Sequence, residues 1–186
     1  MKHSAEDLAF EAYDKGNYED AYPVLSRLAE EGDVQSLLAV GWMCETGAVH
    51  FPDPETARKC YQRAADSGSA DAVNRLGRLL LSEGYVVQAR STFELGAERG
   101  ITSCMYHLGR VLLRNPTNEN DAENGIKCLE KAANRGHLFA KRQILSIKWS
   151  STNSIFTRSF IFLKVVLLIS SFLKEGILNP NSDLLA

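Results

Sequence analysis

The chain lacks the short motifs that mark many enzymes and nucleotide-binding proteins. Its 186 residues contain no GxxxxGK[ST] phosphate loop, no GxGxxG after a predicted strand, no HExxH and no GxSxG. Its four histidines lie in four different parts of the chain. Its carboxylates fall largely at expected helix ends, where capping and the helix dipole account for them. We therefore expect no catalytic residue, no cofactor and no small-molecule substrate.

Cysteine is scarce, and none of the four cysteines forms a CxxC pair. They are Cys44, Cys60, Cys104 and Cys128. Zinc sites need closely spaced ligands, so we expect no metal site and interpret the cysteines as small buried apolar residues. The first residues, MKHSAEDLAFEAYDKGN, contain no long apolar run and no cleavage-site pattern. We therefore expect no secretory signal and a reducing, cytosolic environment.

Net charge is small, at -2, but it is unevenly distributed. Residues 1–140 hold 15 Lys and Arg against 21 Asp and Glu, whereas residues 141–186 hold 6 against 2. An acidic surface is a poor match for nucleic acid, which is bound through clustered basic side chains. The basic excess beside an apolar C-terminal stretch instead favours an anionic membrane surface.

Four copies of a short pattern that ends in glycine run through residues 1–140. The copies read AEEG, AADSG, GAERG and AANRG, and they close at Gly32, Gly68, Gly100 and Gly136, with spacings of 36, 32 and 36 residues. A second series consists of the dipeptides VG or LG. Their glycines, Gly41, Gly77 and Gly109, lie nine residues after the first three closing glycines. Two series in one register indicate a helical repeat array, in which each unit needs its neighbours to bury its apolar face.

Each repeat is predicted to consist of a helix A, a turn, a helix B and a second turn. Helix A is expected at about 5–15, 34–45, 70–82 and 103–114, helix B at about 18–31, 54–67, 86–99 and 121–135, and a fifth helix A near 137. The glycines inside helix A cost ~1 kcal/mol each relative to alanine, so their recurrence predicts close contact with another backbone. One helix B position always carries a large residue, which we expect in the core: Leu25, Tyr61, Phe93 and Leu129.

The combined pattern resembles the Sel-one-like repeat, a relative of the tetratricopeptide repeat. The residues that carry it are Leu76, Gly77, Gly84, Ala89, Phe93, Ala97 and Gly100, with their counterparts in the other units. The fourth unit departs from the pattern, because Asn115 replaces the link glycine and Gly125 replaces the helix B alanine. The resemblance implies an all-α fold, a short right-handed α-solenoid of antiparallel helix pairs, that serves as a protein-binding adaptor or scaffold without catalysis. The array is expected over residues 5–145, divided into 5–32, 33–68, 69–100 and 101–136 plus a partial capping helix.

A stripe on successive A helices is the candidate binding surface. It consists of Leu38, Trp42, Asn74, Arg78, Tyr106 and Arg110. These positions vary in chemistry between units while the flanking positions do not, and aromatic and arginine side chains are enriched in protein-binding hot spots. In the alternative interpretation, Trp42 and Tyr106 are half-buried packing residues and the arginines lie on a solvated face.

The C-terminal stretch is strongly apolar. Residues 159–173, SFIFLKVVLLISSFL, include eleven apolar residues among fifteen. We expect a linker at 146–157, which is rich in Ser, Thr and Asn, and an apolar, membrane-associated helix at 158–178. Residues 155–178 are long enough for a membrane span of ~20 residues, although Lys164 lies inside them. A helix lying in the interface, a helix that caps the last repeat and a partner-binding helix are the alternatives.

The function expected from these features is that of a non-enzymatic protein–protein interaction scaffold. It would bind a protein or peptide segment in a concave helical groove and be tethered to a membrane by residues 158–178. One alternative is an accessory or regulatory subunit of a membrane-bound enzyme or of a secretion or polysaccharide apparatus, and another is a soluble chaperone-like peptide binder. Because basic residues precede the apolar helix, we expect a cytoplasmic array attached to the cytoplasmic (inner) membrane.

Overall fold

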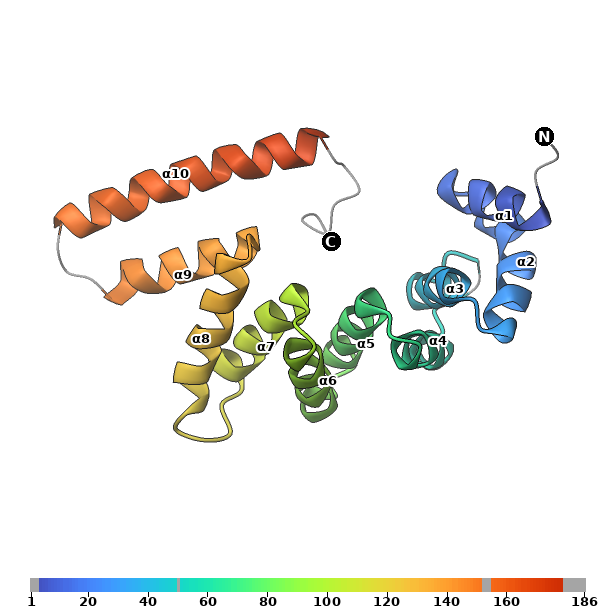
Figure 1. Ribbon diagram of the computed structural model, residues 1–186, viewed down its shortest axis with the longest axis horizontal. Coiled ribbons are helices and arrows are strands. Elements are labelled where there is room, and N and C mark those ends of the chain that lie inside the picture. Colours follow the sequence, from blue (N-terminus) through green and yellow to red (C-terminus); the bar gives the residue numbers. More distant parts are fainter. Residues whose placement is uncertain (1–3, 50, 152–154, 179–186) are drawn as a thin grey trace. The chain divides into compact units, whose positions relative to one another are not determined.

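The chain folds into α-helices throughout the residues that the structure, a computed structural model, describes. These residues are 4–49, 51–151 and 155–178, with the side chains of the last helix described at 159–170. Within them there are ten helices and no strand: α1 (Ala5–Asp14), α2 (Tyr18–Glu31), α3 (Val34–Thr46), α4 (Pro54–Asp66), α5 (Ala70–Ser82), α6 (Val86–Glu98), α7 (Thr102–Arg114), α8 (Asp121–Asn134), α9 (Leu138–Ser151) and α10 (Ile155–Leu178). The predicted all-α fold is confirmed, and the predicted bounds of the repeat helices agree with the observed ones to within one or two residues (Figure 1).

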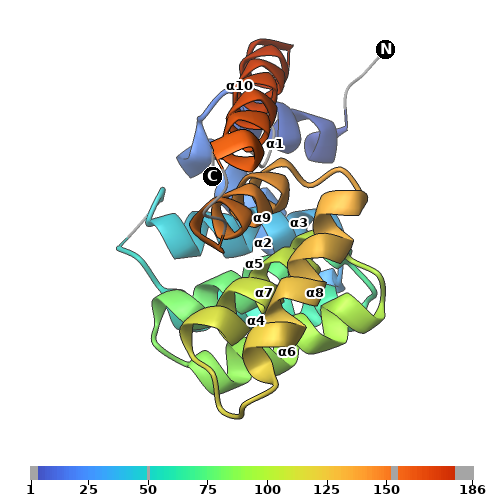
Figure 2. The same ribbon diagram turned by 90° about the vertical axis from the view of Figure 1, so that its left-hand side faces the viewer.

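Two compact units divide the chain. Unit 1 comprises Met1–Gly96 and unit 2 comprises Ala97–Ala186, with the boundary in the last turn of α6. In unit 1 the helices from α1 to α5 each pack against the next, and in unit 2 the same holds from α7 to α10. Consecutive packing of this kind gives the antiparallel helix pairs that the repeat pattern predicts (Figure 2).

Local signals in the sequence explain where the helices begin and end. The side chains of Ser4, Asp33 and Ser69 each accept a hydrogen bond from a backbone N–H in the first turn of the helix that follows. All four glycines that close the repeated pattern have positive φ angles, between 82° and 98°. Glycine adopts this left-handed conformation without steric cost and so ends helix B.

The recurring glycines of helix A make room for a residue of the paired helix B. A Cβ atom added at Gly41 would lie 2.6 Å from Cε1 of Tyr61, and one at Gly77 would overlap the ring of Phe93. At Gly109 a backbone atom is among the nearest, since its added Cβ would lie 2.8 Å from the carbonyl oxygen of Gly125. The predicted backbone contact is therefore confirmed at Gly109, whereas at Gly41 and Gly77 the nearest atoms belong to a buried aromatic ring.

The large residues of helix B form the centre of each helix pair. The four predicted core residues, Leu25, Tyr61, Phe93 and Leu129, are all 0% exposed. Alanines one helical turn away from these large residues, such as Ala57, Ala89 and Ala132, are also fully buried. Alternating large and small side chains let neighbouring helices interdigitate at the density of a protein interior.

The C-terminal region is more helical than the sequence composition suggested. α9 continues through Ser151 and α10 begins at Ile155, so most of the segment expected as a linker, 146–157, is helical, and residues 152–154 lie outside the described residues. The physical reason is that residues 137–175 contain neither glycine nor proline, the two residues that end helices most effectively. No helix in the described part of the chain is both long and apolar enough to cross a membrane.

Candidate protein-binding surface

Three aromatic side chains from three helices meet in unit 1. Tyr13 of α1, Tyr18 at the start of α2 and Trp42 of α3 have ring centroids 5.1 to 5.8 Å apart, mostly in edge-to-face contact. Such pairs add ~0.5–1.5 kcal/mol to the burial of their surface. All three side chains are half-buried and keep part of their surface open to solvent. We call these three residues the aromatic cluster.

Hydrogen-bonded polar side chains of α3, α4 and α5 belong to the same unit. The Tyr61 hydroxyl donates a hydrogen bond of 2.7 Å to Glu45 Oε2, and burial together with this bond to a carboxylate raises the pKa of Tyr61. Arg75 Nε donates a bond of 2.9 Å to Asp71 Oδ2 one turn away. Burial raises the pKa of Tyr13, and the positive charge of Arg75 opposes that increase. Aromatic rings and fixed charges thus share one part of unit 1.

The other predicted site residues of unit 1 differ in exposure. Leu38 lies one turn before Trp42 on α3 and is half-buried, as is Arg78 on α5. Asn74 is only 6% exposed, and its Oδ1 accepts no hydrogen bond from the residues that the structure describes. A buried amide oxygen without a donor costs ~1–3 kcal/mol, so a water or an N–H group that reached it would be stabilising.

In unit 2, the predicted residues Tyr106 and Arg110 belong to a row of rings and cations. The Arg110 guanidinium lies 5.4 Å from the centroid of the Tyr106 ring, which in turn stacks on His137 at 4.3 Å. Phe139 lies next in the row, 6.2 Å from His137, and the Arg142 guanidinium lies 5.8 Å from its ring. Tyr106 also packs against the core of unit 2, so it has a structural role as well.

The structure thus distributes the six predicted residues between the units. Leu38, Trp42, Asn74 and Arg78 lie in unit 1, and Tyr106 and Arg110 lie in unit 2. Whether they bind a partner stays a prediction. Sequence comparison between repeats missed Tyr13, Tyr18 and Phe139, because these residues occupy positions that are not equivalent from one repeat to the next. The only sequence signal for the first two was their place on either side of the first helix–helix link.

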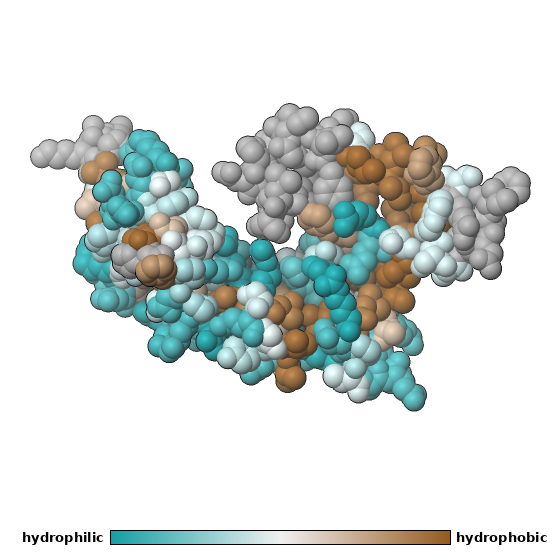
Figure 3. Space-filling model, turned by 180° about the vertical axis from the view of Figure 1, so that it is seen from behind, coloured by the Kyte–Doolittle hydropathy of each residue, from teal (hydrophilic) through white to brown (hydrophobic). Residues whose placement is uncertain are grey.

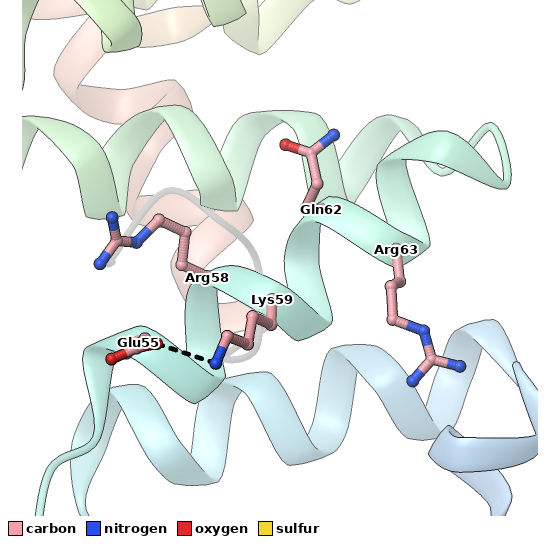
Figure 4. Close-up of a pocket in the computed structure, with 5 residues that line it drawn as sticks. All are labelled: Glu55, Arg58, Lys59, Gln62 and Arg63. Carbon is pink, nitrogen blue, oxygen red and sulfur yellow. Dashed lines mark ion pairs between the residues drawn. The ribbon is translucent and has the colours of Figure 1, made fainter.

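A groove lined mainly by basic residues runs along α4. This helix is a helix B, whereas the predicted binding stripe lies on the A helices. It has a volume of about 650 Å³ and is lined by Glu55, Arg58, Lys59, Gln62 and Arg63 (Figure 4). All three cations have partners: Lys59 pairs with Glu55 at 2.8 Å, Arg58 with Glu83 at 3.6 Å, and Arg63 donates to the carbonyl oxygen of Glu30 at 3.0 Å. We therefore assign this groove a structural role in joining neighbouring helices.

The cysteines behave as packing residues. Cys44, Cys60 and Cys104 are buried, and Cys128 is partly buried. Burial raises the pKa of Cys60 and of Cys104 to about 11, so both thiols are protonated at neutral pH and are poor nucleophiles. No group of three potential metal ligands occurs among the described residues.

Antiparallel helix pairs, each closed by an αL glycine and three of them packed through a helix A glycine, define an α-helical repeat protein. The model of the Sel1 repeat matches residues 34–69 and 89–137, so these two segments are similar to Sel1 repeats. This confirms the resemblance seen in the sequence. No curated protein sequence matches the chain significantly.

Several solved structures share this fold. A Sel1 repeat protein from Oxalobacter formigenes has a TM-score of 0.73 and 19% identity, over 90% of this chain and 69% of its own. The protein c5321, a protective antigen of uropathogenic Escherichia coli, has a TM-score of 0.70 and 20% identity, over 88% of this chain and 37% of its own. The MamA protein has a TM-score of 0.60 and 17% identity, over 94% and 93%. At these identities the likeness establishes the fold, and the Sel1 repeat fold suggests a protein–protein interaction scaffold.

Proposed function

We propose that the chain is a non-enzymatic scaffold that binds a protein or peptide segment at the aromatic cluster of unit 1. The observation that carries this proposal is the exposure of the cluster, which leaves part of Tyr13, Tyr18 and Trp42 open to solvent next to the charge of Arg75. Tyrosine, tryptophan and arginine dominate binding hot spots, because they combine a large apolar area with a directional polar group. Leu38 and Arg78 extend the surface along α3 and α5.

A peptide-display selection with the tagged full-length protein tests the proposal. We expect selected peptides to bind Trp42→Ala and Arg78→Glu at least about tenfold more weakly, as is usual for hot-spot residues. Tyr85→Ala is the matched control, because Tyr85 is a tyrosine of the same unit, 43% exposed, outside the cluster. Thermal unfolding of each variant establishes that it is folded. Unchanged affinity in both Trp42→Ala and Arg78→Glu would refute the proposed surface.

Tethering to a membrane through residues 158–178 is the second part of the proposal. What supports it is the side of α10 that faces away from α9, where large apolar side chains are exposed at Phe160, Phe162 and Leu163. This apolar side of α10, together with the basic residues that precede the helix, would hold the repeats on the cytoplasmic face of the inner membrane. Fractionation of full-length protein with a carbonate wash tests the tether, and full-length protein found only in the supernatant would favour a soluble peptide binder instead.

A further inference from the structure

The strongest feature outside the repeat surface is the C-terminal helix pair of unit 2. α10 packs on α9 and buries Ile161 (5% exposed) and Leu168 (9% exposed), two helical turns apart. Among the residues that the structure describes, twelve large hydrophobic side chains are exposed, and half of them lie on α10: Phe160, Phe162, Leu163, Val166, Leu167 and Ile169. They are 45% to 62% exposed. Figure 3 shows hydrophobic side chains gathered over this part of the molecule.

Large apolar side chains dominate the exposed side of α10 between residues 159 and 170. Between residues 159 and 170 the only charged side chain is Lys164. At 100° per residue Lys164 falls at the edge of the buried stripe of Ile161 and Leu168, and the outward arc is formed by large apolar side chains with Ser159 and Ser170. A helix that faced water would carry its charge outward. The outward arc of residues 159–170 is mostly apolar, which suits a surface that lies in an apolar medium.

A cleft between α8, α9 and α10 lies beside this outward face. Its volume is about 380 Å³, and its walls include Ile144 and Leu145 of α9, with Leu167 and Leu168 of α10. Two lysines, Lys141 and Lys164, also line it. Neither lysine forms an ion pair with any described carboxylate, although the ammonium of Lys164 lies 4.5 Å from the centroid of the Phe160 ring. An apolar cleft that carries two cations matches an anionic group attached to a hydrocarbon chain.

The charge of the surrounding sequence has the same sign. Residues 137–174 contain six basic residues, Lys141, Arg142, Lys148, Arg158, Lys164 and Lys174, and no acidic residue. Each lysine or arginine near a membrane surface adds to the attraction for anionic lipids. A second copy of the chain presents the same positive charge, so electrostatics disfavours self-association through this region and favours a negatively charged surface.

We propose that α10 lies flat in the surface of an anionic phospholipid membrane and that the cleft lined by Lys141 and Lys164 binds a lipid headgroup phosphate. The outward apolar side chains of α10 enter the boundary between headgroups and acyl chains, to a depth of ~5–10 Å. The phosphate accepts hydrogen bonds from the two ammonium groups, and its acyl chains lie against Leu167. This inference rests on the proposed membrane tether and specifies both its lipid class and its geometry, in which α10 lies along the membrane and does not cross it.

Vesicle flotation of the full-length protein tests the inference, with vesicles of phosphatidylcholine alone or of phosphatidylcholine with phosphatidylglycerol. We expect binding only to the vesicles that contain phosphatidylglycerol. The double variant Lys141→Gln with Lys164→Gln should bind about tenfold more weakly than Lys131→Gln with Lys148→Gln, although both lose two charges. Lys131 and Lys148 are exposed lysines of the same unit that do not line the cleft, and thermal unfolding checks that all variants fold.

The other outcomes separate this inference from the tether itself. Equal weakening by the two pairs of substitutions would mean diffuse attraction, and it would overturn the headgroup site but leave the tether. Equal binding to both kinds of vesicle would have the same consequence. Failure of the wild-type protein to bind any vesicle would overturn both. If light scattering then showed a dimer that Phe162→Ser with Leu163→Ser made monomeric, the apolar face would be an interface between two copies.

Discussion

At the scale of single residues, a glycine–aromatic contact holds the second repeat together, and another holds the third. Gly41 leaves room for the ring of Tyr61, and Gly77 does so for Phe93, and both rings are fully buried. The loss of helix propensity at glycine, ~1 kcal/mol, is offset by the burial of a whole aromatic side chain. Where the ring is replaced by leucine, at Leu129, the paired glycine Gly109 lies against both Leu129 and a second glycine, Gly125.

Replacing Gly41 with alanine should destabilise the protein even though alanine is the better helix former. Its Cβ would lie 2.6 Å from the Tyr61 ring, which is enclosed on all sides and has no room to move. We expect the free energy of unfolding to fall by about 1–3 kcal/mol, measured by urea denaturation. Gln35→Ala on the exposed side of α3 is the control, with a change of at most about 0.5 kcal/mol. In a Tyr61→Leu background the cost of Gly41→Ala should be smaller, and an equal cost there would contradict this explanation.

At the scale of elements, the helix ends depend on short-range chemistry that can be read in the sequence. Asp33 stands between the αL glycine that ends α2 and the first residue of α3, and its Oδ2 accepts a bond of 2.7 Å from Ser36 N. Such a cap satisfies a backbone donor that has no partner within the helix. The chain reverses direction between α2 and α3, so this cap also helps to define the turn between two repeats.

Removing this cap should weaken α3. Asp33→Ala is expected to lower the free energy of unfolding by about 1 kcal/mol, since the N–H of Ser36 loses its acceptor. Asp33→Asn keeps an acceptor oxygen and should cost only a few tenths of that value. Chemical denaturation measures both. Equal losses for the two variants would show that the charge of Asp33, and not its hydrogen bond, stabilises the start of α3.

At the scale of the whole molecule, packing is between consecutive helices within each unit. In a repeat array of this kind, stability is close to a sum of repeat and nearest-neighbour contributions, so damage in one place need not unfold the rest. The core of unit 2 is centred on Leu129, Ala132 and Ile144, with Met105 and Ala140 completing the cluster. It belongs to residues after 96 and contains no residue of α1 to α5.

We predict that Leu129→Ala will loosen unit 2 selectively. The cavity left by a fully buried leucine typically costs 2–5 kcal/mol, and Leu129 is 0% exposed. Hydrogen exchange followed by mass spectrometry should show faster exchange in α7, α8 and α9, with α1 to α3 unchanged. Faster exchange of similar size in α1 to α3 would instead show that the chain unfolds as one cooperative body.

The sequence by itself determined the helices and the repeat core. Capping residues, αL glycines and apolar spacing act within a few residues of each other, so they can be read without knowing the fold. For that reason the predicted helix bounds and the four core residues from Leu25 to Leu129 agree with the structure. Periodicity also identified the repeat, because every unit must present the same face to its neighbours.

Only the tertiary structure decided what lies between these elements. The aromatic cluster joins Tyr13, Tyr18 and Trp42 from three helices, and no comparison of equivalent repeat positions would unite them. Whether the neighbour of Gly41 is a backbone or a ring depends on how closely two helices approach, which local sequence does not specify. In the same way, composition marked 159–170 as apolar, but only packing on α9 separated its buried stripe at Ile161 from its exposed side. Contacts between residues distant in the chain are set by the packing of whole helices.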